Sequence, residues 1–302
     1  MLAAANPFFA EPIARDLAAT GMLAALVRPA RRFERARRLF RYALRAADPL
    51  ESLARRAGIP IASADRDATR LAELLARLHT DVFLMATFPF VVGSVPLAVP
   101  RLASLNIHPS LLPRHRGPNP QFWLYHRDDR TAGVSIHAVT GRVDAGPVLA
   151  RSELPLGRGH PVSRLQGELS RLSVPMLRSV LGDLDAGTAE MEPQDDRLAT
   201  TAPRVAPSAR MVDFTSWPAE RVWHFLKGLF PKYREQLHDG RGAAVVYAGV
   251  GAWRQEEHAS LPGTVTPTDG GWLLWCTDGC VELDESRGPE RHDRVEHSSD
   301  TA

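Results

Sequence analysis

Two polar side chains near the middle of the chain, Asn106 and His108, have the functional groups that acyl transfer needs. They are two residues apart, so on an extended segment they share one face. An amide can donate to a developing oxyanion, and an imidazole can move a proton. A remote carboxylate could orient the imidazole, and Asp144 is the candidate. Together these residue types predict acylation of an amine.

The surrounding segments predict an α/β fold. Apolar runs at 1–5, 23–27, 82–86 and 132–139 are typical of strands, and amphipathic segments at 11–20, 48–58, 71–78 and 162–184 predict helices. Alternation of strands and helices favours a parallel sheet covered on both faces, which binds ligands beyond the carboxyl ends of its strands. The first strand is short, as it would be if the start codon were placed slightly late.

A second domain is expected after a linker-like stretch at 200–208. Short segments separated by Gly and Asp turns favour five strands in an OB-like barrel; four of them are expected at 243–247, 263–265, 272–276 and 280–283. Beyond residue 285 the chain is charged with almost no apolar residues, so disorder is expected there. We therefore predict a Rossmann-like domain over 1–200, an all-β OB-like domain over 209–285 and a disordered tail over 286–302.

Composition indicates the cellular compartment of the protein and whether it spans a membrane or holds a metal. No apolar run approaches the roughly 20 residues that a membrane span needs, and the N-terminus lacks the layout of a secretory signal. Cys276 and Cys280, the only cysteines, fit neither a redox motif nor a zinc site, so we expect a cytoplasmic protein without a metal. Residues 207–302 carry 10 Lys and Arg against 15 Asp and Glu, so this part is acidic although the whole chain has net charge +2.

A longer motif contains the three candidate residues. Asn-x-His-x-Ser-Leu-Leu-Pro runs from Asn106 to Pro113, Gly117 follows, and Asp-x-Gly begins at Asp144. This pattern resembles the folate-dependent formyltransferases, with a likeness strongest over 82–150 and extending over about 1–285. The resemblance implies that Asn106, His108 and Asp144 are catalytic. It also implies that N10-formyltetrahydrofolate is the donor and a primary amine is the acceptor, with no metal required.

The resemblance also implies where the folate lies. In the family, a loop after the strand at 82–86 wraps the pterin ring with apolar side chains and main-chain hydrogen bonds. The residues expected to bind the folate here are Phe88, Pro89, Phe90, Val91, Val92, Ser110, Leu111, Leu112, Pro113, Val139 and Gly141.

The leading candidate for the acceptor is methionyl-tRNA, so initiator tRNA is the expected partner. The protein itself is expected to be a monomer. The C-terminal domain resembles the barrel of methionyl-tRNA formyltransferases, and eight arginines within 28–45 lie where those enzymes carry a basic tRNA-binding insertion. The same arginines could equally form the solvated face of a helix. The residues expected on the acceptor side are Arg38, Arg41, His115, Arg116 and Asn119. The acidic C-terminal domain argues against tRNA.

The alternative acceptor is a small amine, such as an amino sugar on a nucleotide. His137 and the motif Asp144-Ala145-Gly146-Pro147 look closer to sugar-amine and glycinamide-ribonucleotide formyltransferases. Pro118-Asn119-Pro120 also departs from the Ala-Ala-Pro that is common in the methionyl-tRNA enzymes. A third hypothesis is a non-catalytic folate-binding module, which the presence of all three catalytic residue types disfavours.

Overall fold

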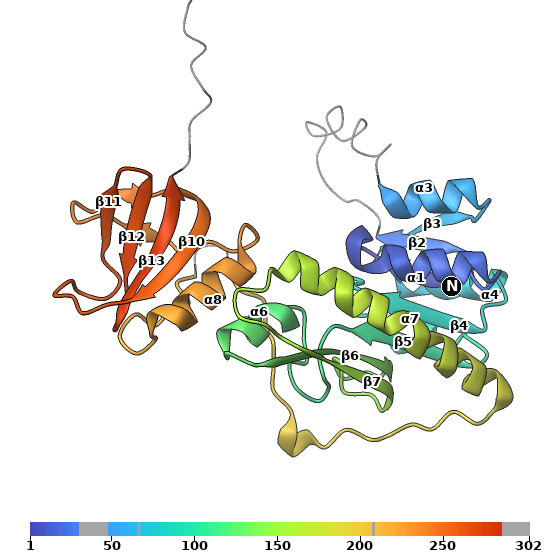
Figure 1. Ribbon diagram of the computed structural model, residues 1–302. Helices are drawn as coiled ribbons and strands as arrows, with labels where there is room; N and C mark the ends of the chain where they lie inside the picture. Colours follow the sequence, from blue (N-terminus) through green and yellow to red (C-terminus); the bar gives the residue numbers. More distant parts are fainter. Residues whose placement is uncertain (30–47, 66, 207–208, 286–302) are drawn as a thin grey trace, which may run out of the picture. The chain divides into compact units, whose positions relative to one another are not determined.

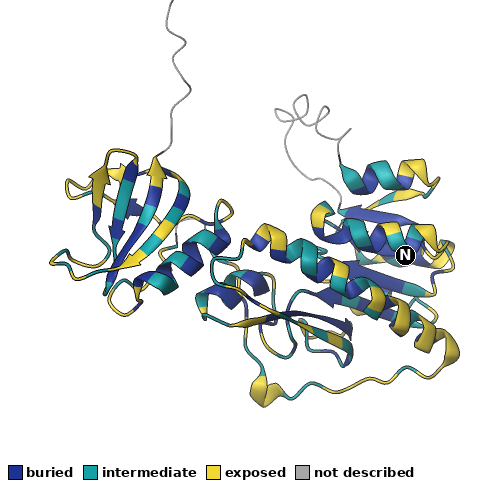
Figure 2. Ribbon diagram, in the orientation of Figure 1, coloured by how far each residue is buried: buried dark blue, intermediate teal, exposed yellow. Residues whose placement is uncertain are grey.

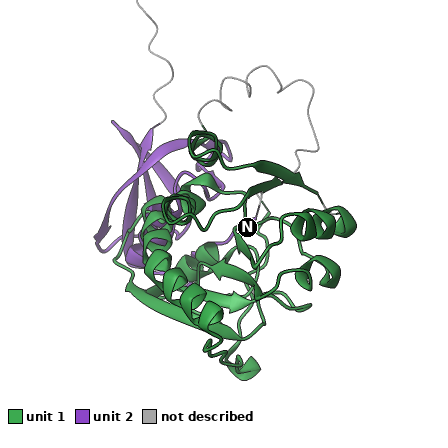
Figure 3. Cartoon of the chain, turned by 90° about the vertical axis from the view of Figure 1, so that its right-hand side faces the viewer, with its two compact units in different colours: residues 1–206 green, residues 207–302 purple. Residues whose placement is uncertain are grey.

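The computed structural model describes residues 1–29, 48–65, 67–206 and 209–285. The chain divides into two compact units, residues 1–206 (unit 1) and residues 207–302 (unit 2) (Figure 3). The predicted disordered tail at 286–302 lies outside the described residues.

Unit 1 is an α/β unit with one central sheet (Figure 1). Its elements in chain order are β1 (Leu2–Ala4), α1 (Pro7–Ala19), β2 (Leu26–Pro29), α3 (Pro49–Arg56), β3 (Ile61–Ala64), α4 (Ala68–Arg77), β4 (Val82–Ala86), α5 (Ser94–Leu97), β5 (Ala103–His108), α6 (Pro120–His126), β6 (Thr131–Ala138), β7 (Val148–Pro155), α7 (Val162–Ala186) and the short 3₁₀ helix η1 (Asp196–Leu198).

The sheet of unit 1 has the order β3-β2-β1-β4-β5-β6-β7. The strands from β3 to β5 are parallel, which confirms the predicted Rossmann-like architecture. However, β6 pairs antiparallel with β5 and with β7, so one end of the sheet is antiparallel. Strands β3 and β7 were not predicted. Both alternate between exposed and less exposed residues, so neither is the continuous apolar run that marked β4.

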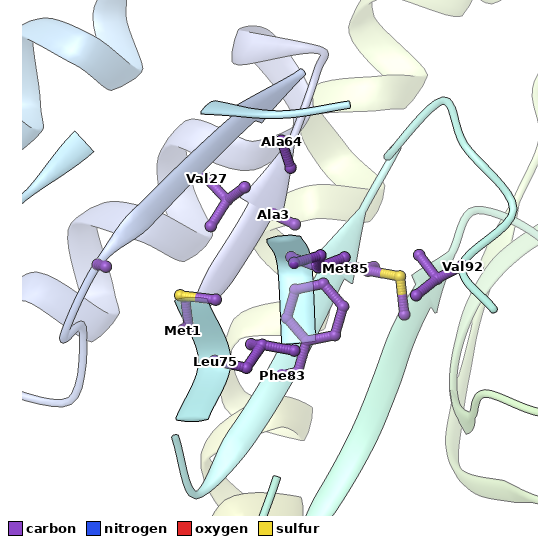
Figure 4. Packing of buried hydrophobic residues seen from close by; sticks show 10 residues of the cluster. Met1, Ala3, Val27, Ala64, Leu75, Phe83, Met85 and Val92 are labelled. Carbon is purple, nitrogen blue, oxygen red and sulfur yellow. The ribbon is translucent and has the colours of Figure 1, made fainter. Parts of the chain in front are cut away.

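Helices cover both faces of this sheet. Alternate residues of the central strands, among them Ala3, Val27, Phe83 and Met85, pack with Leu75 of α4 in a buried cluster (Figure 4). By the two-residue period of strands, their neighbours face the opposite side, where α1 packs against α7 (Figure 1). The central strands are buried on both faces (Figure 2), which explains their nearly continuous apolar sequence.

Local sequence signals determine where the helices begin. Asp48 caps α3 by accepting hydrogen bonds from the backbone N–H groups of Leu50 and Glu51, as the sequence predicts. Helix α1 begins at Pro7, four residues earlier than expected, because the Asn6 side chain accepts from Phe8 N and acts as the cap. Proline at the first helical position agrees with both assignments.

Unit 2 is a small β unit with one helix, α8 (Ala219–Leu229). Strands β10 (Tyr247–Gln255), β11 (Val265–Thr268), β12 (Gly271–Trp275) and β13 (Gly279–Glu285) form an antiparallel sheet in the order β10-β13-β12-β11, while β8 (Leu237–His238) and β9 (Ala244–Val245) form a hairpin. A small all-β domain is thus confirmed. The long strand β10 was missed because it contains Gly249 and Gly251, which favour a turn in sequence. Both glycines lie close to side chains of β13, since an added Cβ would come within 2.1 Å of the Asp284 carboxylate at position 249 and 3.0 Å of Glu282 Cβ at position 251.

No helix in the described part of the chain is long and apolar enough to cross a membrane.

Candidate active site

Asn106 and His108 lie at the carboxyl end of β5, where a parallel sheet binds ligands. Both line one pocket, as expected for residues two apart on a strand. The antiparallel register sets Asn106 opposite His137 of β6 and His108 opposite Ser135. The pairing of β5 with β6 therefore places a second imidazole, that of His137, beside Asn106.

Asp144 reaches the site from the loop between β6 and β7. Its Oδ2 accepts a hydrogen bond of 2.8 Å from Gly117 N and lies 3.6 Å from His108 Nδ1. Its Oδ1 accepts from Asn106 Nδ2 at 3.3 Å and lies 3.5 Å from His137 Nε2. The carboxylate thus joins the amide and both imidazoles, so the structure brings together the three residues predicted from sequence.

The hydrogen bonds assign a tautomer to His108. Its Nε2 lies 2.9 Å from the carbonyl oxygen of His115, which can only accept, so Nε2 carries a proton. The nitrogen left to accept a proton in the neutral ring is Nδ1, on the Asp144 side. Burial lowers the pKa of His108 below its usual value of 6.5, although the Asp144 charge and the His115 carbonyl act in the opposite direction. The resting imidazole is neutral near pH 7.

Asp144 remains ionised beside this imidazole. Burial alone would raise its pKa, but the neighbouring His108 and His137 and the Gly117 N–H outweigh burial and lower the pKa to about 2. His137 Nδ1 donates to the Ala138 carbonyl oxygen at 2.9 Å, so its Nε2 can accept from Asn106 Nδ2 at 3.1 Å. A neutral base next to a fixed negative charge is the arrangement that a proton acceptor requires.

These polar groups border a pocket of about 500 Å³. The predicted loop Phe88–Val92 lines it, as do Val139 and Gly141. Most of the exposed lining is apolar, which suits a flat ring system, while the hydrogen-bonding groups gather around Asn106 and His108. The pocket can hold an aromatic ligand with its reactive end against the polar cluster.

Comparison with known proteins places this chain in a family. The model for formyl transferases matches residues 35–181. Methionyl-tRNA formyltransferase of Roseiflexus castenholzii is 31% identical over 243 residues, covering 79% of this chain and 76% of that protein. The chain belongs to the formyl transferase family. It is a formyltransferase, and the amine-acylation chemistry predicted from Asn106, His108 and Asp144 agrees with that class.

Solved structures confirm the fold of this formyltransferase. An N-formyltransferase of Helicobacter canadensis, in a complex with folinic acid and dTDP-3-aminofucose, has a TM-score of 0.68 at 12% identity, covering 94% of this chain and 98% of that one. A variant of HypX from Aquifex aeolicus has a TM-score of 0.62 at 17% identity; 93% of this chain is covered but only 44% of HypX. At such identities the likeness concerns the fold alone.

The segment Ser110–Pro113 is not among the residues that line this pocket. Ser135, fully buried, donates from Oγ to the Ser110 carbonyl and accepts from Leu112 N. Ser110 Oγ donates to the Arg114 carbonyl, and Leu112 is buried. In the formyltransferase this segment supports the residues around His108, whereas the resemblance assigned it to folate contact.

His115 and Arg116 are buried rather than directed toward an acceptor. His115 is 2% exposed, and its Nε2 lies 2.6 Å from Asp129 Oδ2. Arg116 is 9% exposed and donates to Gln194 and Asp196. Asn119, at the start of α6, is also absent from the pocket lining, although Pro118 and Pro120 are part of it. His115 and Arg116 therefore lack side-chain access to the pocket, although they follow the motif directly in sequence.

The arginine-rich segment is mostly undescribed. Arg38 and Arg41 lie in 30–47, outside the described residues. Arg28, which we counted with the cationic group, is 8% exposed and donates to the Ala4 carbonyl at 2.7 Å and to Asp48 Oδ2 at 2.8 Å. Its place on β2 buries the guanidinium, so Arg28 ties β1 to the start of α3 and does not belong to a solvated face.

Sequence reasoning missed two arginines and one backbone donor at the pocket. Arg142 and Arg204 line it, and the Gly117 N–H binds Asp144. Arg142 directly precedes the Asp144 motif and could have been considered on that ground. Arg204 lies in a segment interpreted only as a linker, and no local signal connects it to the site. Among the described residues, no group of three His, Cys, Asp or Glu side chains could hold a metal ion.

Proposed function

We propose that this formyltransferase moves the formyl group of N10-formyltetrahydrofolate to a primary amine, with Asn106, His108 and Asp144 as the catalytic residues. The observation that carries the proposal is the Asp144 carboxylate within 3.6 Å of His108 Nδ1 and 3.3 Å of Asn106 Nδ2, at the edge of a largely apolar pocket. The folate ring would lie against Phe88–Val92, Val139 and Gly141. Its formyl group would face Asn106 and His108.

In the proposed mechanism the amine attacks the formyl carbon while His108 Nδ1 takes the proton that the nitrogen loses. The His115 carbonyl keeps the other proton on Nε2 and so sets the tautomer of the imidazole, which the sequence predicts Asp144 to orient. Asp144 instead stabilises the imidazolium that forms. The proton then passes to the departing nitrogen of the folate as the tetrahedral intermediate collapses, which returns His108 to its neutral form.

Asn106 would stabilise the oxyanion of that intermediate. Its Nδ2 donates to both His137 Nε2 and Asp144 Oδ1, at 3.1 and 3.3 Å. The longer bond, to Asp144, would be exchanged for the oxyanion, while His137 keeps the amide correctly oriented. Catalytic hydrogen bonds commonly rearrange in this way when substrate binds.

The acceptor we favour is methionyl-tRNA. Eight of the relatives with 27 to 32% identity are named methionyl-tRNA formyltransferases, and they match between 67% and 93% of this chain. The arginines in 30–47 would supply phosphate contacts, with Arg142 and Arg204 close to the reacting end. Guanidinium groups bind phosphate oxygens in a bidentate manner, so all of them suit a nucleic acid.

The alternative acceptor is an amino sugar carried on a nucleotide. His137 at the centre of the polar cluster and the net acidity of residues 207–302 favour it. Arg142 and Arg204 would then bind the diphosphate. The two acceptors differ in size, so they predict different roles for the arginines of 30–47. A non-catalytic folate-binding module would show no turnover with any amine.

A salt titration of turnover separates the acceptors. For tRNA, changing Arg35, Arg37, Arg38 and Arg41 to Gln should raise the KM for tRNA steeply and reduce the salt slope by about one unit per lost phosphate contact, with little effect on the folate KM. The matched control changes Arg15, Arg55, Arg70 and Arg164 to Gln; these are exposed, and within the described residues each pairs with an acid on its own helix or at the cap of that helix. A wild-type rate insensitive to salt between about 50 and 200 mM would refute tRNA.

A further inference from the structure

A segment that precedes unit 2 packs beneath the proposed active site. Residues 192–202, called the strap here, follow α7. At one end, Glu192 and Val148 exchange two backbone hydrogen bonds of 2.8 Å at the start of β7. At the other end, Arg116 N donates to the Thr200 carbonyl at 2.8 Å and Ala202 N donates to the Arg116 carbonyl at 2.6 Å. The strap therefore contacts the chain shortly after Asp144, at Val148, and directly before Gly117, at Arg116.

Gln194 connects these two segments with its side chain. Its Nε2 donates to the carbonyl oxygens of Asp144 at 2.9 Å and Gly146 at 2.6 Å, and its Oε1 accepts from Arg116 Nε at 3.0 Å. The neighbouring residue Gly117 binds the Asp144 carboxylate. A closed ring of contacts results, in which Asp144 is held through its side chain by Gly117 and through its backbone by Gln194.

Asp144 needs such support because its backbone is strained. Its φ is 49°, in the left-handed region that a residue with a Cβ seldom adopts. The preceding residues Thr140–Val143 are exposed, so few contacts hold that side of the loop. On the other side, Gly146 lies so close to β6 that an added Cβ would be 1.9 Å from the Ala138 carbonyl oxygen. Gln194 donates to the carbonyl groups of Asp144 and Gly146, so its two hydrogen bonds hold the part of the loop that lies between the exposed residues and β6.

The other contacts of the strap are less able to do this. Asp196 pairs with Arg116 at 2.8 Å and Arg142 at 3.0 Å, but its side chain is 55% exposed, so solvent screens both pairs. Gln194 is half-buried and uncharged, and its three hydrogen bonds have fixed directions. Since a misplacement of about 1 Å can cost about 10²-fold in rate, directional support matters more here than charge.

We propose that Gln194 is a positioning residue, which holds Asp144 opposite His108 by linking the Asp144 loop to Arg116. This inference rests on the proposed function, because it assumes that the Asp144–His108 pair serves catalysis. It makes a residue between α7 and the predicted linker part of the support of the active site. Without Gln194 the Asp144 loop relaxes, the carboxylate moves away from Nδ1, and His108 loses the charge that raises its proton affinity.

Two substitutions test this proposal in the full-length protein. Gln194→Met keeps the length and neutrality of the side chain but forms none of the three hydrogen bonds. Gln194→Glu can still accept from Arg116 but, when ionised, cannot donate to the two carbonyls. Both should lower kcat by about 10- to 100-fold while the KM for the folate donor changes less than about threefold. The control is Arg197→Gln in the same strap, since the Arg197 side chain is 89% exposed and, among the residues that the structure describes, pairs with Asp195 alone; its kcat should match wild type.

A second measurement does not depend on turnover. The pKa of His108, followed by NMR, should fall in Gln194→Met relative to wild type, because Asp144 raises this pKa and would be farther away. An unchanged His108 pKa, or wild-type kcat in Gln194→Glu, would overturn the role of Gln194. Absence of formyl transfer by the wild type would instead refute the proposed function, and the NMR result would still report whether Gln194 positions Asp144.

Discussion

Asp144 in unit 1 and Glu235 in unit 2 are both carboxylates that accept hydrogen bonds from backbone N–H groups, yet their surroundings differ. Asp144 lies between two imidazoles at the edge of a pocket. Glu235 is 2% exposed, and its Oε2 accepts from Met211 N, Val212 N and the Tyr233 hydroxyl. Glu235 therefore links the backbone at Met211 and Val212 to the segment directly before β8.

The titratable partners of the two carboxylates explain the difference in role. Imidazoles exchange protons near neutral pH, so a carboxylate beside them can influence a proton transfer. Burial and the Glu235 charge raise the pKa of Tyr233 far above neutrality, and burial raises the pKa of Tyr247, whose hydroxyl accepts from Glu235 N, to about 12. These phenols stay protonated at any physiological pH. A buried carboxylate thus indicates catalysis only when its partners can change charge.

The largest effect should come from the unit 1 cluster. His108→Ala or Asp144→Asn should lower turnover by about 10²-fold or more, because each removes a separate part of the proton transfer. The fold should remain, since neither residue belongs to the buried apolar core. Thermal melting and protection by a folate analogue check this, the latter by mass action. Wild-type turnover in His108→Ala would contradict the mechanism.

A smaller effect, of a different kind, is expected in unit 2. Glu235→Leu should lower the free energy of unfolding by about 1 to 3 kcal/mol for each donor left unpaired in the interior. Turnover per folded molecule should stay close to wild type. Glu235→Gln is the matched control, because it keeps an oxygen that can accept the same bonds. If Glu235→Leu abolished turnover in protein that melts like wild type, the contrast between the two carboxylates would be wrong.

The contrast also shows how much of this molecule can be inferred from sequence. Asn106 and His108 were predictable because a strand places alternate residues on one face, and Asp144 was predictable from the motif that it shares with the family. The strand β4 and the cap at Asp48 have strong local signals. The strand β6 was also predicted from its apolar run, but the antiparallel direction of β6 and β7 was not, because strand direction depends on how the chain returns to the sheet and not on residues within the strand.

The contacts that support the site were harder to predict for a related reason. Gln194 is 50 residues from Asp144 in sequence. Gly117 binds Asp144 through its backbone N–H, a group that every residue except proline has, so the residue type does not predict this contact. His115 and Arg116 looked accessible by their place in the motif, but the strap covers them. Sequence spacing identifies residues on one element, whereas contacts between loops emerge only from the assembled fold.

The third prediction concerns pH and has the smallest effect. Burial holds the pKa of His108 below 6.5, so the folded state keeps the ring neutral while the unfolded chain takes up a proton near pH 6.5. The stability from this group is therefore complete above pH 6.5 and is lost as the pH falls through the lowered pKa. A single proton contributes at most about 1.4 kcal/mol per pH unit.

Asp144 acts in a separate, more acidic window. Its pKa is lowered from 3.8 to about 2, so its contribution is present above pH 3.8 and is lost as the pH falls toward 2. Denaturant unfolding of wild type between pH 7 and 5 should show a loss of stability that is smaller in His108→Gln. In Asp144→Asn this loss should grow, because His108 then lacks the negative charge that helps it to hold a proton in the fold. An equal loss in wild type and both variants would show that His108 and Asp144 are not coupled, and the contrast between a carboxylate with imidazole partners and one without them would then fail.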